Sequence, residues 1–571
     1  MVVTGQHAPA ELLGALSTLL TVVRSVRLDL ATDDVDDVRT QRDAVRNQLA
    51  DYLVPRLVQM EAPLLTVVGG STGAGKSTLV NSIVGETVTE SGVLRPTTRS
   101  PVLVHHPDDE AWFLADRILP GLPRTEDLGN TTYALRLKAS TRLPRGLAIL
   151  DAPDVDSIDR GNREVAAHLL AASDLWLFVT SAARYSDQIP WDYLRQAAER
   201  GTSVAVVLDR TSPAGITEVR GHLARMMTSR GLSDSPLFTV PEAAVGPEGL
   251  LPDEAVESLR GWLYDLAGDD RARELVIMQT LDGTVRQNVQ ASFAVADALD
   301  TQIAAAGQLI DIVEDAFGAA IARAIGECKD ASLLSGEVVA RWQEFVGTGE
   351  ILRSVEEKVG RIRTRLVDGV TGKRTKTEDV ARAIEQAMAM MLIDHAESAS
   401  ARVAVGWAEH GPGRSILEVE RGLDRASRDM RVRAERVARD WQQQVLETVR
   451  VQTTDKRLTA RFMALGVGGL GTAVMVAALA ASTADAEART ADIARRLLED
   501  VFGAQVAVQL VDDVVADLAG RIDEALVLEA ARYLDLLPMP DALRASQDAL
   551  RAAARRSEYA RHVGFLDEET R

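Results

Sequence analysis

The residues whose types and spacing could do chemistry lie together near residue 70. The stretch from Val67 to Thr78 is VVGGSTGAGKST, a glycine and four arbitrary residues followed by Gly75-Lys76-Ser77, the pattern of a phosphate-binding loop. Glycines let successive N–H groups point at one phosphate, and Lys76 adds a positive charge at the β- and γ-phosphates. The hydroxyl of Ser77 would bind Mg²⁺. The residues that we expect to contact the nucleotide are Gly70, Ser71, Thr72, Gly73, Ala74, Gly75, Lys76, Ser77 and Thr78.

Such a loop needs a strand before it and a helix after it, and the flanking sequence supplies both. An apolar run precedes the loop and a helix-compatible run, residues 79–84, follows it. Short apolar runs then alternate with helices up to about residue 267, which predicts an α/β domain with a mostly parallel sheet and helices on both faces. Ligands of such sheets bind at the carboxyl ends of strands, where Gly70 lies. The predicted strands are 64–68, 102–105, 133–137, 147–150, 175–179, 204–208 and 237–240.

Two downstream segments carry groups that suit a Mg²⁺-bound triphosphate. Thr97 and Thr98 precede the second strand, where a GTPase uses a threonine to complete Mg²⁺ coordination when the γ-phosphate is present. Asp151 follows the strand at 147–150 and opens the sequence Asp-Ala-Pro-Asp154. An aspartate at the end of such a strand is the Mg²⁺-side carboxylate of P-loop enzymes.

In this order of motifs the chain resembles the dynamin-like large GTPases, particularly the bacterial ones. The shared features are the VVGG…GKS loop, a Thr-Arg-x-Pro segment at 98–101, an Asp-x-Pro segment at 151–153, and long helices afterwards. The resemblance covers most of the chain in element order and is specific in residues 60 to 270. It implies binding and hydrolysis of GTP with Mg²⁺, in which Lys76 and Thr98 act in catalysis. Ser77, Thr98 and Asp151 would bind the metal, with Thr97 as second choice for the threonine.

The same resemblance implies partners and a location. Pairing of the nucleotide domains, as a homo-oligomer or with a related GTPase, would be coupled to movement of a helical stalk and to binding or remodelling of an anionic lipid membrane. We therefore expect a cytoplasmic protein at the inner face of the cell membrane. The single cysteine, Cys328, fits a reducing compartment, and the N-terminus lacks the basic flank of a signal peptide.

The sequence departs from that family where the base is read. The motif expected after residue 208 is Asn/Thr-Lys-x-Asp, whereas this chain has Asp209-Arg210-Thr211-Ser212. The missing carboxylate is the group that selects guanine, so the preference for GTP follows from the resemblance alone. Asp209 or Arg210 would contact the base in an altered way.

Two further departures concern hydrolysis. Asp154 stands where the family carries a glycine whose N–H touches the γ-phosphate, and Thr72 and Gly73 stand where dynamins place a catalytic Gln-Ser pair. The group that positions the water is therefore unidentified, and hydrolysis would be slow or dependent on assembly. Two alternatives stay open: a P-loop ATPase or kinase-like enzyme, and a nucleotide-binding scaffold with little hydrolysis.

Composition narrows the other possibilities. The chain has 571 residues, enough for more than one domain, and its 84 acidic against 64 basic residues give a formal net charge of −20. Such a chain is a poor partner for nucleic acid. His105 and His106 are neighbours in a predicted strand and point to opposite faces, so we do not expect them to share a metal ion.

Beyond residue 270 the pattern is helical and predicts a stalk at 271–461. We expect one helix from Ser415 to Val451, ~55 Å long. Residues 462–483 carry no charge and predict a membrane-contacting segment that bends near residues 468–471, the alternative being a buried helix rich in small residues. Seven basic residues against one acidic residue between Lys358 and Lys376 would favour anionic lipid.

The expected domains follow from these segments. The nucleotide domain spans 58–270, and helices at 1–57 and 484–571 would pack together as a neck beside it. A single membrane crossing at 462–483 would separate the last helices from this neck. We therefore predict a re-entrant or peripheral attachment with both termini on the cytoplasmic side.

Overall fold

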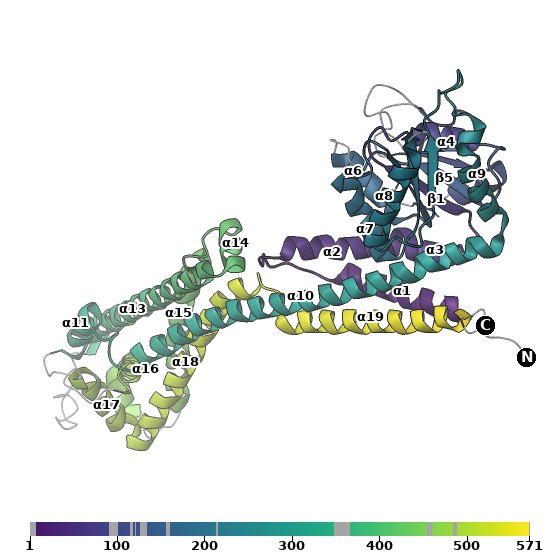
Figure 1. The fold of residues 1–571 in the computed structure, drawn as a ribbon. Helices are drawn as coiled ribbons and strands as arrows, with labels where there is room; N and C mark the ends of the chain where they lie inside the picture. The colour runs from purple at the N-terminus through teal and green to yellow at the C-terminus, as the bar shows by residue number, and fades with distance from the viewer. Residues whose placement is uncertain are drawn as a thin grey trace, which may run out of the picture. The chain divides into compact units, whose positions relative to one another are not determined.

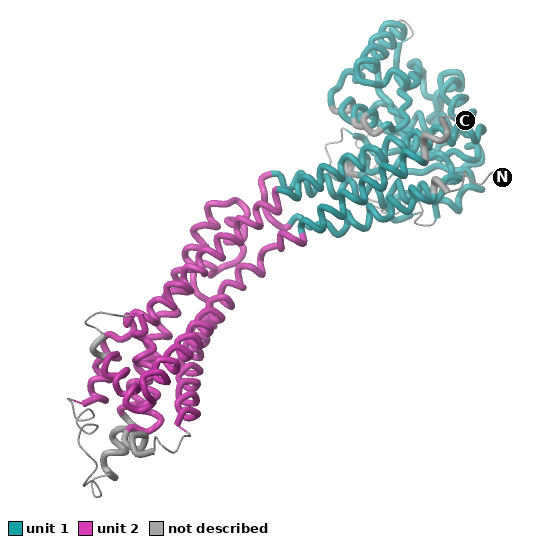
Figure 2. Tube along the Cα trace, turned by 90° about the horizontal axis from the view of Figure 1, so that it is seen from below, with its two compact units in different colours: residues 1–28, 34–300, 543–571 teal, residues 29–33, 301–542 magenta. Residues whose placement is uncertain are grey.

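The computed structural model describes residues 7–90, 101–114, 118–119, 122–125, 134–155, 160–212, 215–347, 366–453, 459–482 and 488–569. The chain forms two compact units (Figure 2). Unit 1 comprises residues 1–28, 34–300 and 543–571, and unit 2 comprises residues 29–33 and 301–542. Segments from both ends of the chain therefore belong to unit 1.

Unit 1 contains an eight-stranded sheet with the strand order β3-β4-β2-β5-β1-β6-β7-β8. Neighbouring strands are parallel except β2 and β5, which are antiparallel. The central strands β1, β5 and β6 are buried along their whole length because helices cover both faces, with α4 and α9 on one side and α6, α7 and α8 on the other (Figure 1). In chain order the strands are Leu64–Gly70, Val102–His105, Arg124–Thr125, Leu135–Ala139, Leu147–Asp151, Leu175–Ser181, Ser203–Thr211 and Leu237–Pro241.

This architecture confirms the predicted fold class, a mostly parallel α/β sheet covered on both faces plus a long helical region. Two details of the sheet differ from the prediction. The sequence did not predict β3, because a strand of two residues is too short to show a hydrophobic pattern. It also did not predict that β2 pairs with β5 antiparallel, because an apolar run looks the same for a parallel and an antiparallel strand. The predicted strand 133–137 is β4, Leu135–Ala139, and residue 133 lies outside the described part of the chain.

The C-terminal helix α19, Pro540–Glu569, lies along α10, Asp270–Glu327, in unit 1 (Figure 1). Along α10 and α19, Gln547 Nε2 donates to the carbonyl of Ala296 at 2.7 Å and Arg561 Nη1 bonds Asp282 Oδ1 at 2.6 Å (Figure 1). The helices that contribute to unit 1 are α1 His7–Ser25, α2 Val35–Gln48, the π-helix η1 Leu49–Leu53, α3 Val54–Val58, α4 Lys76–Val84, η2 Pro107–Asp109, α5 Ala111–Leu114, α6 Arg160–Ala171, α7 Gln188–Arg200, α8 Ile216–Ser229, α9 Asp253–Gly268, the first part of α10 Asp270–Glu327 and most of α19 Pro540–Glu569.

A buried carboxylate fastens these helices to the sheet. Asp174, at the start of β6, accepts hydrogen bonds from the backbone N–H of Leu65 at 2.8 Å and from Arg56 Nε at 2.9 Å. Its own carbonyl accepts from the Thr280 hydroxyl of α10 at 2.9 Å. Burial raises the pKa of Asp174, and the charge of Arg56 opposes that rise. The N-terminal helices and α10 thus meet at one point below strands β1 and β6.

Unit 2 is entirely helical among its described residues. Buried tryptophans with satisfied indole N–H groups lie at its centre: Trp407 donates to the carbonyl of Leu309 and Trp441 to that of Val514, both at 3.1 Å. Its helices are the second part of α10, α11 Gly336–Val346, α13 Leu366–Glu409, α14 Gly411–Val419, α15 Arg428–Gln452, α16 Thr459–Ala478, α17 Ala488–Phe502 and α18 Ala504–Leu534.

The single helix expected from Ser415 to Val451 is wrong. Helix α14 ends at Val419, and α15 begins after Ser427, whose side chain caps it by accepting from the N–H of Met430. Gly422, with φ +83°, lies in the turn between them. Helix α15 buries one face, which includes Met430, Val437 and Trp441, and it is ~37 Å long at 1.5 Å per residue.

The uncharged stretch 462–483 contains most of α16, and its bend lies elsewhere than predicted. The backbone leaves the helical region at Gly466, with φ +69°, and not at residues 468–471. Residues 470–480 are buried in unit 2. A Cβ at Gly471 would lie 2.5 Å from Leu446 Cδ2, so the small residues allow close helix packing. No helix in the described ranges is both long and apolar enough to cross a bilayer.

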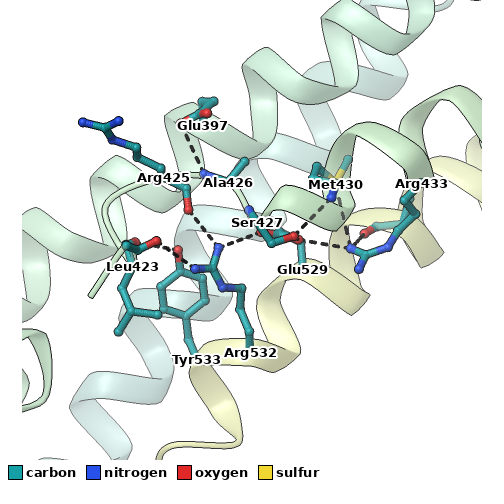
Figure 3. Close-up of polar contacts among 12 residues, drawn as sticks. Glu397, Leu423, Arg425, Ala426, Ser427, Met430, Arg433, Glu529, Arg532 and Tyr533 are labelled. Atoms are coloured by element: carbon teal, nitrogen blue, oxygen red, sulfur yellow. Dashed lines mark hydrogen bonds and ion pairs between the residues drawn. The ribbon is translucent and has the colours of Figure 1, made fainter. Parts of the chain in front are cut away.

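A second buried carboxylate organises the turn between α14 and α15 (Figure 3). Glu529 of α18 is 1% exposed and accepts from the backbone N–H and the hydroxyl of Ser427, both at 2.6 Å. Arg433 and Arg532 bond the same carboxylate at 3.1 and 2.8 Å. Burial would raise the pKa of Glu529, but the Ser427 hydrogen bonds and the Arg532 charge outweigh it and hold the pKa below its ordinary value.

We predict that Glu529→Gln destabilises the chain by about 2 kcal/mol at neutral pH, because two arginines lose their shared charge partner. Since the folded pKa of Glu529 is lowered, its stabilising contribution is present above the ordinary value of 4.5 and is lost as the pH falls through the folded value. Urea denaturation at neutral and acidic pH measures this. The control Glu524→Gln, at an exposed position of the same helix, should change stability by no more than ~0.5 kcal/mol. Equal midpoints for the two variants would contradict the assignment.

Candidate phosphate-binding site

The loop between β1 and α4 has a backbone that only glycine can supply at two positions. Gly70 has φ +151°, and a Cβ there would lie 2.0 Å from the carbonyl oxygen of Val179 on the neighbouring strand. Gly75 has φ +94°, and a Cβ there would lie 2.3 Å from Asp209 Oδ2. Gly75 is also the N-cap of α4, so the helix begins with Lys76 and its first N–H groups have no partner within the helix.

Lys76 lies inside this loop. Its side chain is 5% exposed, and Nζ donates to the carbonyls of Gly70 and Ser71 at 3.1 Å each. It also forms an ion pair with Asp154, which follows β5. A buried ammonium needs such partners, because an unpaired charge at this depth is costly.

The residues that we expect to bind Mg²⁺ meet at Ser77, the residue that follows Lys76 in α4. Ser77 Oγ donates to Asp151 Oδ2 at 2.6 Å. Asp151 is fully buried, and burial raises the pKa of its carboxyl, opposed by the bonds from Ser77 and Thr89 and by the Lys76 charge. Its second oxygen, Oδ1, is buried with no hydrogen-bond partner in the described structure. The Ser77 hydroxyl and the Asp151 carboxylate, whose Oδ1 has no partner in the described structure, are the hard oxygen ligands that suit Mg²⁺.

Thr89 is a site residue that the sequence pattern did not single out. Its hydroxyl donates to Asp151 Oδ2 at 2.8 Å, beside the Ser77 bond. Asn81 of α4 holds it in place, because the Asn81 amide oxygen accepts from the N–H of Thr89 at 2.9 Å and its nitrogen donates to the Thr89 carbonyl at 2.9 Å. The only available signal was Asn81, a buried polar residue on an otherwise apolar helix face. Thr97 and Thr98 lie outside the described residues.

The base-side residues also reach the loop. Asp209, at the end of β7, is 4% exposed, faces Gly75, and accepts from the N–H of Arg210 at 2.7 Å. Burial raises the pKa of Asp209 to about 6. Arg210 has φ +54°, a conformation that non-glycine residues rarely adopt, and it is exposed. Asp209 therefore lies against the phosphate loop, whereas the Arg210 side chain is exposed.

Ser71 to Ala74 and Thr78 also lie where the motif predicts, in the loop and the first turn of α4. The two histidines act structurally: His105 packs on Phe113 with ring centroids 5.3 Å apart, and His106 accepts from the N–H of Asp108. No cluster of three or more potential metal ligands occurs among residues that the structure describes. Cys328 is buried, which raises the pKa of its thiol to about 12 and makes it unreactive.

Comparison with known proteins found no matching family model and no matching curated protein. Three solved structures have the following similarity to the chain. A structure described as an oligomerised bacterial dynamin pair shares 11% identity over 94% of this chain and 97% of its own, with a TM-score of 0.41. LeoA, a bacterial dynamin GTPase from ETEC, shares 12% over 98% and 97%, with a TM-score of 0.25. Era, solved with MgGDPNP and ribosomal RNA, shares 16% over 35% and 56%, with a TM-score of 0.23.

All three TM-scores are below 0.5. Solved structures of bacterial dynamins match this chain over nearly its full length.

Proposed function

We propose that the protein is a dynamin-like GTPase that binds and hydrolyses GTP with Mg²⁺. One observation carries the proposal: Lys76, Ser77 and Asp151 meet at the end of β1, with the lysine at the loop carbonyls and the serine on the aspartate. This is the set of groups that a P-loop enzyme needs to hold a nucleoside triphosphate and its metal ion.

Each residue has a distinct role in this proposal. The loop N–H groups and Lys76 bind the β- and γ-phosphates, and Ser77 and Asp151 hold Mg²⁺, which neutralises charge on the phosphates when bound. Thr89 keeps the Asp151 carboxylate oriented by its 2.8 Å bond. Thr98 is proposed, from the sequence resemblance, to complete the metal site and to act in catalysis together with Lys76.

An ATPase or kinase-like enzyme remains the second candidate, on a specific observation. Ser212 stands where a guanine-reading carboxylate would be, and its hydroxyl accepts from the N–H of Gly215 at 3.3 Å. The chain therefore places no carboxylate at that position.

A nucleotide-binding scaffold with little hydrolysis is the third candidate, because Thr72 and Gly73 bring no amide side chain to the phosphates. Phosphate release, measured with and without liposomes, distinguishes an enzyme from a scaffold.

The wider proposal concerns assembly and membranes. We infer pairing of the nucleotide domains, in a homo-oligomer or with a related GTPase, coupled to movement of the helical stalk and to an anionic membrane at the inner face of the cell. The support is the sequence resemblance and the basic run at 358–376. In terms of parts, unit 1 would be the GTPase domain with its neck helices, and unit 2 the stalk.

The Lys76→Ala variant should lose nucleotide affinity roughly a hundredfold, because charge-assisted bonds to two phosphates disappear. Ser77→Ala should weaken binding in Mg²⁺ more than binding in a chelator, since its role passes through the metal. Calorimetric titration with GTP and then ATP measures both effects and the base preference. Lys138→Ala, at an exposed lysine of β4, is the matched control. Unchanged affinity in Lys76→Ala, with the fold checked by circular dichroism, would contradict the assignment.

Asp209 supports a prediction about pH. It stands where related GTPases carry an amide or a hydroxyl, and with a pKa of about 6 its neutral form can donate a hydrogen bond as these groups do. Because the folded pKa is raised from 3.8, its stabilising contribution is present below 3.8 and is lost as the pH rises through about 6.

Asp209→Asn should therefore stabilise the nucleotide-free chain by about 1–2 kcal/mol above pH ~7 and by little below pH ~4. Urea denaturation across that range measures the difference. Asp234→Asn, at an exposed aspartate before β8, should give the same small change at every pH. A pH-independent effect of Asp209→Asn would show that the burial of Asp209 does not govern its titration.

A membrane test must respect the packing of α16. Deleting 462–483 would remove buried residues of unit 2 and so could unfold it, whereas charge substitutions in the basic run at 358–376 test lipid binding directly. We expect the chain to float with anionic liposomes, less so in high salt, and the triple substitution of Arg361, Arg363 and Arg365 to glutamine to weaken flotation, since each basic residue near the surface contributes ~1 kcal/mol. The control triple Arg428, Arg431 and Arg436 to glutamine lies on the exposed face of α15. Equal loss in both triples would point to net charge alone.

A further inference from the structure

The ion pair inside the phosphate loop has a consequence for which nucleotide the site prefers. A lysine ammonium has three N–H donors. In this chain Lys76 has three acceptors, the carbonyls of Gly70 and Ser71 and the carboxylate of Asp154. Every donor that a P-loop lysine offers to phosphate oxygens is therefore already engaged by the protein, and one of its partners carries a negative charge.

The backbone holds Asp154 against the start of the phosphate-binding loop. After β5, the N–H of Ala152 donates to the carbonyl of Val68 at 3.2 Å, and the N–H of Val155 donates to the carbonyl of Gly70 at 3.4 Å. Residue 154 is thereby held against the start of the loop. A P-loop lysine is shared by the β- and γ-phosphates, and the segment after the Mg²⁺-side aspartate is the one that responds to the γ-phosphate in GTPases.

We infer that the Asp154 carboxylate occupies the place of a γ-phosphate oxygen and makes the site discriminate against nucleoside triphosphate in favour of diphosphate. This rests on the proposed function. A diphosphate can displace a neutral carbonyl from Lys76 and leave the Lys76–Asp154 pair in place, whereas a triphosphate must displace Asp154 and bring a second negative charge beside it. The Asp154 and Lys76 side chains are 19% and 5% exposed, so solvent screens that repulsion poorly.

The test compares two ligands on the full-length chain with Mg²⁺: GDP and a non-hydrolysable GTP analogue, titrated by calorimetry. Asp154→Asn keeps the shape and removes the charge. We expect it to tighten analogue binding on the order of tenfold relative to GDP. Asp154→Glu, which keeps the charge, should preserve the wild-type ratio, and Asp187→Asn, at an exposed aspartate before α7, is the control for net charge.

The outcomes separate this inference from the proposed function. If the wild-type chain binds neither ligand, the proposed function itself fails. If it binds both, and Asp154→Asn leaves their affinity ratio unchanged, Asp154 does not exclude the γ-phosphate and the inference is overturned. A loss of turnover in Asp154→Asn at an unchanged ratio would likewise overturn it and assign Asp154 to catalysis. Thermal melting of each variant confirms that the affinities come from folded protein.

Discussion

The buried charge of Lys76 is the constraint on which the nucleotide domain depends. A lysine side chain that is only 5% exposed must be surrounded by acceptors. Two carbonyls of the loop accept hydrogen bonds from Lys76, and Asp154 forms an ion pair with it. The geometry requires Gly70 to approach Val179 more closely than any side chain would permit. The strand order serves the same loop, because β1 lies between β5 and β6. Strand β5 supplies Asp151 and leads to Asp154, and β6 supplies Val179, against which Gly70 packs.

Charge around the loop is unevenly balanced. Three carboxylates lie around the loop: Asp151 ends β5, Asp154 pairs with the buried Lys76, and Asp209 of β7 faces Gly75. Burial raises the pKa of Asp151 and of Asp209, because each carboxylate is shielded from water. A divalent cation beside Asp151 would relieve that excess, and the orphaned Oδ1 is the atom that such an ion would contact first. The site is thus better suited to a metal-bound phosphate than to a bare anion.

Sequence reasoning succeeded where the signal is local. The loop motif places its own residues, and continuous apolar runs such as 147–150 mark buried strands because both faces of the sheet are covered. It failed where the determining contact is distant in sequence. Gly422 and the capping residue Ser427 are weak local signals of the break at 420–427, and the turn is held by Glu529 of α18, 102 residues away from Ser427 in the sequence. Thr89 was equally hidden, because its role depends on Asn81 and Asp151 meeting in space.

The uncharged stretch around α16 shows why composition alone misleads about membranes. A bilayer and a tightly packed helical core both select against charge, and both tolerate glycine and alanine where helices approach closely. What distinguishes them is the neighbour: a Cβ at Gly469 would lie 3.3 Å from Phe345, and one at Gly471 would lie 2.5 Å from Leu446. Protein side chains occupy the space next to these glycines, and residues 470–480 are part of the buried core of unit 2. In the proposed function, attachment to lipid would then come from charged or peripheral parts of the chain, where binding is electrostatic and sensitive to salt.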